Sequence, residues 1–396
     1  MTEQHLSLDV IRQRLNELDD KLLCLLSERR ELSIEVAKSK IETAKAVRDA
    51  KREQELLVKL INNGKQKYQL DAQYITKLFH IIIEDSVLLQ QSYLQNLANP
   101  EQSRKPLARV AFLGSKGSYS HLATLDYFSR KNMDLVEMNC AKFKDITDTV
   151  ESGHADYGVL PIENTSSGSI NEVYDLLQHT SLYIVGEITQ AIEHCLVAKQ
   201  EMPIEDIHTL YSHPQPHQQC SEFLHRLDDI DLQTCASTAD AMKKVAEMTD
   251  KNVAAIGNGI SGKLYGLQVI KDNIANQTEN HTRFIIVARK PVEVSPQIPA
   301  KTTLIMSTSQ EPGALVEALL VLRQYGINMT KLESRPILGN PWEEMFYVDL
   351  QAHLDSVEMQ NAITELTKLT RHLKVLGCYP IENVKPTQVH LATEAK

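Results

Sequence analysis

The chain has 396 residues, of which 42% are hydrophobic and 24% are charged. At roughly 100 to 200 residues per domain this length predicts two to four domains, and the composition excludes collagen-like, disordered and fibrous proteins. The formal net charge is −10, and the first sixty residues hold twelve basic and twelve acidic side chains, so no basic patch predicts nucleic-acid binding. The chain start lacks a secretory signal pattern, and no apolar run approaches the roughly 18 residues of a membrane span. We therefore expect a cytoplasmic protein without a membrane partner.

Two stretches rich in proline and polar residues, 98–108 and 290–301, interrupt the apolar pattern. Such stretches are typical of linkers between domains. They predict three domains, at residues 1–98, 108–290 and 301–386.

The first segment carries only the periodicity of helices. Apolar residues recur every three or four positions, which predicts a helix over residues 8–43. At ~1.5 Å per residue this helix is over ~50 Å long, so we expect its apolar stripe to pack against a second copy of the chain in a homodimer. A second helix is predicted to begin after Asp49 and to stop near Gly64, and a third to begin after Asp71.

The second and third segments mix strands and helices. Short apolar runs alternate with helical patterns in the second segment, which predicts a doubly wound α/β fold. Two extended stretches, 182–199 and 282–290, are expected to cross between two lobes with a cleft between them. The third segment reads strand, helix, strand, strand, helix, strand, which is ferredoxin-like. The predicted fold class is multidomain: an all-α domain, a two-lobed α/β domain like the periplasmic binding proteins, and an α+β domain.

Basic and polar residues occupy helix positions where the apolar stripe predicts buried side chains. Arg29 and Lys40 do so in the first helix, and Ser86 and Gln90 lie one turn apart on the third. These four side chains predict a small pocket for a carboxylated ligand, because a guanidinium binds a carboxylate through two parallel bonds. Snorkelling of the basic side chain towards solvent, or a structural ion pair with a nearby glutamate, is the alternative. Arg12 lies ~26 Å from Arg29 along the helix and can join the pocket only from a partner chain.

Four motifs carry these residues: SERREL at 27–32, VAKSK at 36–40, VRDAKRE at 47–53 and IIEDSVLLQQ at 82–91. They resemble the all-helical chorismate mutases, in which the two sites of an intertwined dimer each borrow an arginine across the interface. The resemblance implies that Arg12 from the partner, Arg29 and Arg52 hold the substrate carboxylates, that Asp49 and Glu53 bind its hydroxyl, and that Lys40 and Gln90 face the ether oxygen with Ser86 alongside. Conversion of chorismate to prephenate is an intramolecular rearrangement, so it requires a held conformer and charge stabilisation but no proton transfer.

The second segment contains FLGSKGSYSH at 112–121, LPIENTSSGSINEVYDLL at 160–177, YSHPQPHQQC at 211–220 and HTRFIIVAR at 281–289. These motifs are similar to those of prephenate dehydratases, except that Ser115 stands where the first motif more often has proline. The resemblance implies Thr282 as the catalytic residue, with Asn164, Ser212 and Gln219 in the same cleft and Ser118, Glu163 and Thr165 as further prephenate-binding neighbours. Thr282 is expected to donate a hydrogen bond to the leaving hydroxyl, with Glu163 or His121 as alternative proton donors.

The third segment contains GALV at 313–316 and ESRP at 333–336, which resemble the ACT regulatory domain in its phenylalanine-sensing form. Gly313 at a helix start would let backbone N–H groups approach a ligand carboxylate. The implied L-phenylalanine effector site consists of Gly313, Ala314, Leu315, Val316, Glu333, Ser334, Arg335 and Pro336. The chain as a whole thus resembles bifunctional enzymes that convert chorismate to prephenate and then to phenylpyruvate under feedback inhibition by phenylalanine.

Other signals carry less weight. Residues 257–262 match GxGxxG, but too few residues follow for the remaining elements of a dinucleotide-binding domain. The six cysteines lie at least fifteen residues apart, and His213 and His217 enclose two prolines, so we expect neither a metal nor a cofactor. The alternative function is a ligand-sensing transcription regulator. Such a regulator needs a DNA-binding helix-turn-helix, and the first predicted helix is too long to belong to one. The first segment also has no excess of basic residues to contact DNA phosphates.

Overall fold

The structure is a computed structural model that describes residues 7–103, 107–131, 133–227, 230–277, 279–337 and 343–381. The predicted end of the third domain, residue 386, lies outside the described residues. Contacts divide the chain into two units. The first holds the described residues up to Pro100 together with Val294–Pro299, and the second holds those of Glu101–Glu293 and Ala300–Asn383.

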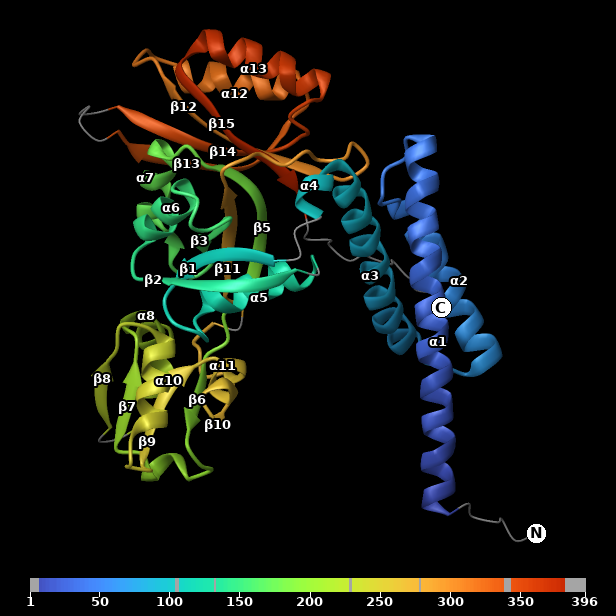
Figure 1. Ribbon diagram of the computed structural model, residues 1–396, viewed down its shortest axis with the longest axis vertical. Helices are drawn as coiled ribbons and strands as arrows, with labels where there is room; N and C mark the ends of the chain where they lie inside the picture. Colours follow the sequence, from blue (N-terminus) through green and yellow to red (C-terminus); the bar gives the residue numbers. More distant parts are fainter. Residues whose placement is uncertain are drawn as a thin grey trace, which may run out of the picture. The chain divides into compact units, whose positions relative to one another are not determined.

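The first unit is built from helices that begin at side-chain caps. The helices are α1 (Leu8–Thr43), α2 (Ala50–Tyr68) and α3 (Ala72–Ala98), and the short α4 (Pro100–Ser103) follows (Figure 1). Asp49 accepts a hydrogen bond from the backbone N–H of Arg52, and Asp71 accepts two from the first turn of α3, so the predicted helix starts are confirmed. In the part of the chain that the structure describes, no helix is long and apolar enough to cross a membrane.

Gly64 lies inside α2 and does not end it. The predicted stop near Gly64 is wrong, because α2 continues to Tyr68 and ends where Gln69 adopts a left-handed conformation with φ 54°. A Cβ atom built on Gly64 would lie 2.2 Å from Cδ1 of Ile75 in α3. The glycine therefore allows close approach of two helices, which a one-dimensional pattern does not distinguish from a C-cap.

A small core joins α1 and α3. It includes Ala37, Val87 and Leu94, and Ile298 from the segment Val294–Pro299 packs into it. The same segment accepts a hydrogen bond of 2.8 Å at the Gln297 carbonyl from the backbone N–H of Val47. Part of the stretch predicted as a linker is thus a packed element of the helical unit.

The first lobe of the second unit contains a sheet of order β2-β1-β3-β11-β5, with β4 paired to β3. Its strands are β1 (Leu107–Leu113), β2 (Asp134–Cys140), β3 (Tyr157–Asn164), β4 (Gly168–Ser169), β5 (Tyr183–Ala191) and β11 (His281–Ala288), and its helices are α5 (Tyr119–Ser129), α6 (Phe143–Glu151) and α7 (Asn171–His179). β1 pairs with β2 and β3 in parallel, whereas β11 runs antiparallel to both β3 and β5.

The second lobe contains a sheet of order β10-β6-β9-β7-β8. Its strands are β6 (Cys195–Ala198), β7 (Thr209–Ser212), β8 (Asp231–Thr234), β9 (Val253–Gly257) and β10 (Gln268–Lys271), and its helices are the 3-10 helix η1 (Ile204–Asp206), α8 (Pro214–Gln219), α9 (Ser221–Leu224), α10 (Thr238–Glu247) and α11 (Gly259–Leu264).

Two connections join the lobes, which confirms the predicted two-lobed fold. β5 leads into β6 through residues 192–194, and β10 leads back into β11. The connections meet where the backbone N–H of Ile192 donates to the carbonyl of Asn280 at 2.8 Å. The prediction that residues 282–290 make the second crossing is wrong, because β11 lies wholly within the first sheet. The chain crosses back to the first lobe before these residues.

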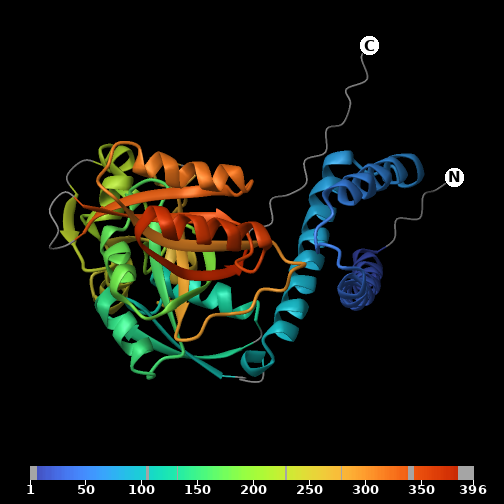
Figure 2. The same cartoon turned by 90° about the horizontal axis from the view of Figure 1, so that it is seen from above.

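The C-terminal segment forms a four-stranded antiparallel sheet of order β13-β14-β12-β15. Its elements are β12 (Ala300–Thr308), α12 (Ala314–Gln324), β13 (Asn328–Pro336), β14 (Glu344–Gln351), α13 (Val357–Leu369) and β15 (Thr370–Pro380), in the predicted ferredoxin-like order. Helices α12 and α13 lie side by side on one face of this sheet (Figures 1 and 2). The other face shares a hydrophobic core with the first lobe, where Ile305, Tyr347 and Leu376 pack with Leu160 and Ile184.

Candidate active sites

Arg29 anchors the pocket predicted in the helical unit. Its Nη1 donates a hydrogen bond to Ser86 Oγ and another, of 3.1 Å, to the carbonyl of Ile82, and these bonds join α1 to α3. The nearby Asp85 pairs instead with Arg30 at 3.6 Å. Among the described residues Arg29 therefore forms no ion pair, so the structural ion pair considered from the sequence is not formed. A half-buried guanidinium without a carboxylate is suited to an anionic ligand.

Lys40 lies about three turns further along α1. Its Nζ donates to Gln90 Oε1 at 3.1 Å and to a backbone carbonyl. Burial lowers the pKa of Lys40 and the nearby Arg52 lowers it further, whereas Asp49 and Glu53 raise it. Lys40 thus stands between α3 and the start of α2, and the predicted residues of these three helices come together.

Arg48, which precedes α2, is a residue near the pocket that the sequence analysis did not assign. Asp49 Oδ1 accepts a hydrogen bond of 3.0 Å from the backbone N–H of Arg52, and Arg48 Nε lies 3.3 Å from Glu53 Oε2. Arg48 belongs to the same VRDAKRE motif as Asp49, and its place next to the cap is the signal that could have identified it. It fixes the carboxylate of Glu53 beside the pocket.

Arg12 is not part of this pocket within one chain. It is exposed on α1, seventeen residues before Arg29, which corresponds to ~26 Å along a helix. Within one chain Arg12 therefore does not reach the pocket.

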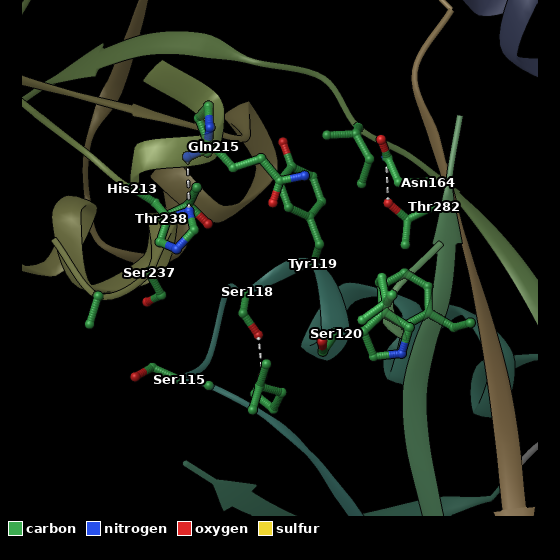
Figure 3. A pocket seen from close by; sticks show the side chains of 18 of the residues that line it. Ser115, Ser118, Tyr119, Ser120, Asn164, His213, Gln215, Ser237, Thr238 and Thr282 are labelled. Atoms are coloured by element: carbon green, nitrogen blue, oxygen red, sulfur yellow. Dashed lines mark hydrogen bonds between the residues drawn. The ribbon is translucent and has the colours of Figure 1, made fainter. Parts of the chain in front are cut away.

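A cavity of about 970 Å³ lies between the two lobes of the second unit (Figure 3). Four of the residues predicted to bind prephenate line it: Ser118, Asn164, Gln219 and Thr282. In the first lobe, Asn164 and Thr282 lie on β3 and β11, and Ser118 caps α5. Gln219 ends α8 in the second lobe, so both lobes contribute to the cavity.

Asn164 and Thr282 form a pair on the cavity wall. They are register partners on β3 and β11, and Asn164 Nδ2 donates to Thr282 Oγ1 at 2.9 Å (Figure 3). The backbone N–H groups of Ser166 and Ser167 donate to Asn164 Oδ1 at 2.9 Å each, which fixes the orientation of the amide. Because Thr282 Oγ1 accepts from Asn164, and no acceptor for its own hydrogen occurs among the described residues, the hydroxyl is available to donate to a ligand.

His194 holds Gln219 from the connection between the lobes. Its Nε2 lies 2.8 Å from Gln219 Oε1, and its Nδ1 lies 3.3 Å from the hydroxyl of Tyr119. Burial lowers the pKa of His194 and so favours its neutral imidazole, although the bond to Gln219 opposes this shift. None of the four dehydratase-like motifs contains His194, and its contact with Gln219 arises only from the fold.

Neutral groups dominate the cavity wall. None of its described lining residues is Lys or Arg. Helices α5 and α10 begin at the cavity after the caps Ser118 and Ser237, whose hydroxyls accept hydrogen bonds from backbone N–H groups at 3.2 Å and 3.0 Å. Helix N-termini attract anions through their free N–H groups and dipoles. The cavity is therefore suited to an anion that is bound by amides, hydroxyls and helix ends.

Ser115 joins the two lobes across the mouth of this cavity. Its hydroxyl donates to Asp240 Oδ1 at 3.1 Å, and Ser237 Oγ donates to the other oxygen of the same carboxylate at 2.7 Å. Proline, which more often stands at this position of the motif, has no donor. The serine at this position thus adds a contact between the two lobes.

Comparison with known proteins decides the family. The chorismate mutase type II family matches residues 11–91, and the prephenate dehydratase family matches residues 110–292. The bifunctional chorismate mutase/prephenate dehydratase of Escherichia coli (strain K12) is 57% identical over 379 residues, which cover 95% of this chain and 97% of the relative. The chain belongs to the bifunctional chorismate mutase/prephenate dehydratases.

More distant relatives and solved structures also match the chain. The bifunctional chorismate mutase/prephenate dehydratase of Aquifex aeolicus (strain VF5) is 30% identical and covers 93% of this chain and 97% of its own. A prephenate dehydratase from Arthrobacter aurescens, solved in complex with L-Phe, has a TM-score of 0.63 and 26% identity over 71% of this chain and 93% of that one. GqqA, called a novel type of quorum quenching acylase, has a TM-score of 0.61 and 30% identity over 69% of this chain and 97% of that one. The family assignment replaces the transcription regulator considered from the sequence.

Glu163 of this bifunctional enzyme does not reach the dehydratase cavity. Successive residues of a strand point to opposite faces, so Glu163 faces away from the cavity that Asn164 lines. Its Oε1 lies 2.6 Å from Arg283 Nε. The structure therefore corrects the prediction that Glu163 binds prephenate or supplies a proton.

Three further side chains of the dehydratase motifs lie outside the cavity lining. Thr165 Oγ1 accepts a hydrogen bond of 2.9 Å from a backbone N–H of β11, and Ser212 Oγ donates to the carbonyl of the next residue at 2.9 Å. His121 is 3% exposed, and its Nδ1 accepts from a backbone N–H at 3.0 Å. The hydroxyls of Thr165 and Ser212 serve the local backbone, and His121 Nε2 lies 3.4 Å from Glu137 Oε1, so the structure places all three outside the cavity in which they were predicted to touch the substrate or donate a proton.

The predicted effector residues lie on α12 and β13. Gly313 precedes α12 with φ +88°, and Ala314, Leu315 and Val316 form its first turn. Glu333 Oε2 accepts a hydrogen bond of 2.7 Å from Ser169, and Arg335 binds Asp175 through two bonds of 2.9 and 3.0 Å. Ser334 and Pro336 alternate with these residues along the edge strand and are exposed.

Proposed function

We propose that the helical unit rearranges chorismate to prephenate in a site completed by a second copy of the chain. The residues assigned to this site are Arg12 of the second copy, Arg29, Lys40, Asp49, Arg52, Glu53, Ser86 and Gln90. The observation that carries the proposal is that Arg29 forms no ion pair with a carboxylate among the described residues, while Lys40 and Gln90, paired at 3.1 Å, lie further along the same face, one turn of α3 from the Ser86 that Arg29 binds. Arg29 would hold a substrate carboxylate, and Lys40 with Gln90 would stabilise the charge that develops on the ether oxygen.

The proposed homodimer is inferred from the surface of α1, and a cytoplasmic location is proposed separately. Leu15, Leu18, Leu22 and Leu25 are between 51% and 62% exposed in the single chain. A continuous apolar stripe of this kind is typical of a protein interface. Covering it with a second α1 would also bring Arg12 towards the other pocket, so that one contact explains both features.

Mixed dimers test the shared site. Arg12→Ala and Lys40→Ala should each abolish the mutase, yet a dimer of one chain of each kind contains one complete site out of two. Mixed dimers isolated through two different affinity tags should therefore show about half of the wild-type mutase rate, whereas each parent variant shows none. Mixed dimers without mutase activity would contradict the contribution of Arg12 from the partner.

We infer that the cavity of the second unit converts prephenate to phenylpyruvate. Prephenate loses its ring carboxylate as CO2, the electrons of that bond enter the ring, and the hydroxyl leaves and takes up a proton to become water. Thr282 donates a hydrogen bond to the leaving hydroxyl, and Asn164 holds Thr282 in position at 2.9 Å. Gln219, Ser118 and the starts of α5 and α10 bind the two carboxylates. The gain of an aromatic ring drives the reaction, so a weak donor suffices.

We propose that the ferredoxin-like segment is an ACT regulatory domain that binds L-phenylalanine. The prephenate dehydratase of A. aurescens that resembles this chain is described in complex with L-Phe. The positive φ of Gly313 opens the first N–H groups of α12 to a ligand carboxylate. Feedback then requires that the effector favour a state with a less active dehydratase cavity.

A single assay with chorismate alone tests the whole function. Purified enzyme should consume chorismate and release phenylpyruvate without an added cofactor, and L-phenylalanine should suppress phenylpyruvate formation. Accumulation of prephenate without phenylpyruvate would refute the dehydratase proposal and leave only the mutase.

The effector site is tested by glycine substitutions at the two ends of α12. Gly313→Ala forces a side chain into a left-handed conformation at the proposed ligand, so the phenylalanine concentration for half inhibition should rise about tenfold with an unchanged uninhibited rate. Gly326→Ala is the matched control, because Gly326 also has positive φ and open space around it but lies at the other end of the helix. Equal loss of inhibition in both variants would indicate general damage to the domain.

A further inference from the structure

A buried histidine, His194, lies at the wall of the dehydratase cavity. It is 1% exposed and belongs to the connection between β5 and β6. Both nitrogens of its ring face polar atoms, since Nε2 lies 2.8 Å from Gln219 Oε1 in the second lobe and Nδ1 lies 3.3 Å from the hydroxyl of Tyr119 in the first. His194 thus contacts one residue of each lobe at a point where the chain crosses between them.

The partners of His194 determine which ring nitrogen carries the hydrogen. Burial favours the neutral imidazole, which donates at one nitrogen and accepts at the other, whereas an amide oxygen only accepts. Nε2 therefore donates to Gln219 Oε1, and Nδ1 is the acceptor. Nδ1 faces the Tyr119 hydroxyl, which also donates to the carbonyl of Glu193 at 2.7 Å. Burial raises the pKa of Tyr119, so this hydroxyl keeps the hydrogen that the two acceptors share.

The second connection between the lobes holds the main chain of both partners. The backbone N–H of Asn276 donates to the Gln219 carbonyl at 2.7 Å, and that of Ile274 donates to the His194 carbonyl at 3.0 Å. Asn276 and Ile274 lie between β10 and β11. With the main chain fixed, the orientation of the Gln219 amide depends on the hydrogen bonds of its side chain.

The bond from His194 decides which end of the Gln219 amide faces the cavity. Gln219 lines the cavity, and its Oε1 is occupied by His194, so Nε2 is the end left for a ligand. No residue that the structure describes accepts a hydrogen bond from this Nε2. The described lining contains neither Lys nor Arg, so an amide donor is valuable for a carboxylate, whereas an amide oxygen in the same place would repel it.

We propose that His194 is a positioning residue for the dehydratase reaction, which holds the Gln219 amide so that its NH2 group donates to a carboxylate of prephenate. The inference rests on the proposed role of Gln219 in carboxylate binding. Without the bond from His194 the amide can turn by half a rotation, and its oxygen then faces the dianion. A residue outside the four motifs thus determines how a motif residue recognises the substrate.

Substitutions of His194 test this inference. His194→Leu should raise KM for prephenate about tenfold with kcat within about twofold of the wild type, because a carboxylate contact is made in the ground state and the transition state alike. His194→Gln should keep KM near that of the wild type, because the amide nitrogen of a glutamine can take the place of Nε2. His194→Asn should resemble His194→Leu, because its shorter side chain does not reach this position.

His208→Leu is the matched control. His208 is an exposed histidine of the same lobe that lies 3.1 Å from Asp250 and does not line the cavity, so its loss should change neither constant. Assays use prephenate without phenylalanine, and the mutase rate and melting temperature of each preparation are measured in parallel.

A double-mutant cycle separates positioning of Gln219 from a general structural role. In a Gln219→Ala background, His194→Leu should change KM by less than about twofold, because the amide that it positions is gone. A further tenfold rise in that background would contradict the inference, because His194 would then act through another group.

An unchanged KM in His194→Leu, or a loss confined to kcat, would also overturn the inference. Should His194→Leu fail to fold, the comparison of His194→Gln with His194→Asn decides, and equal KM values in these two variants would refute it. Failure of the underlying assignment is distinguishable, because the wild type would then form no phenylpyruvate from prephenate at all.

Discussion

Replacement of Thr282 by valine should lower the dehydratase kcat by roughly a hundredfold to a thousandfold, the range observed when one transition-state hydrogen bond is removed from an active site. Valine keeps the branched shape of the side chain but cannot donate to the leaving hydroxyl. Asn164 would lose one of its three acceptors but keep Asn280 Oδ1, the His281 carbonyl and its bonds from the 166–167 backbone, so the cavity should keep its form. Rates of phenylpyruvate release from prephenate measure the effect, with the mutase rate as an internal reference.

Two variants control this experiment. Thr282→Ser retains the hydroxyl and should keep most of the activity, whereas Thr367→Val makes the same chemical change on the exposed side of α13 and should have no effect. Normal dehydratase activity in Thr282→Val would show that another group assists the departure of the hydroxyl.

Replacement of Lys40 by alanine should reduce the mutase rate by on the order of a thousandfold, while most of the dehydratase activity remains. Lys40 is partly buried and donates to Gln90, so its loss removes the positive charge proposed to stabilise the developing charge on the ether oxygen. Chorismate consumption measures the mutase, and turnover of supplied prephenate measures the dehydratase in the same preparation.

Lys38→Ala is the matched control for this variant. Lys38 lies two residues away on the exposed side of α1, where it pairs with Glu35 at 2.7 Å, so both rates should stay near those of the wild type. If Lys40→Ala abolished both activities while the protein remained folded, the assignment of two separate active sites would be wrong.

The helical pocket was largely predictable because its information is local. The starts of α2 and α3 at Asp49 and Asp71 depend on caps that act within four residues. The inward positions of Arg29 and Lys40 follow from the helical period, which also placed Ser86 and Gln90 on one face of α3. By contrast, Arg12 is exposed on α1 and lies far from this pocket within one chain, so its proposed contribution could not be read from the helical period alone.

The dehydratase cavity was predictable only in part. The motifs identified Asn164 and Thr282, but the resemblance also placed Glu163 beside them. Neighbouring strand residues point to opposite faces, so Glu163 cannot face the cavity that Asn164 lines. His194 carried no recognisable signal, because its contact with Gln219 depends on the meeting of two lobes.

The sequence by itself determined the family, the order of helices and strands, and most of the residues that face each site, because caps, periodicity and motifs act over short stretches of chain. The tertiary structure alone decided which motif residues reach the cavity and which serve the backbone. It also decided that Arg283, Lys301, Lys331 and Asp349 form one largely buried ion cluster with Glu163 and Glu187, because charges separated by as many as 168 residues meet only when the sheets pack. Long-range pairing of this kind has no periodicity, and the physical requirement to neutralise a buried charge becomes visible only in the folded chain.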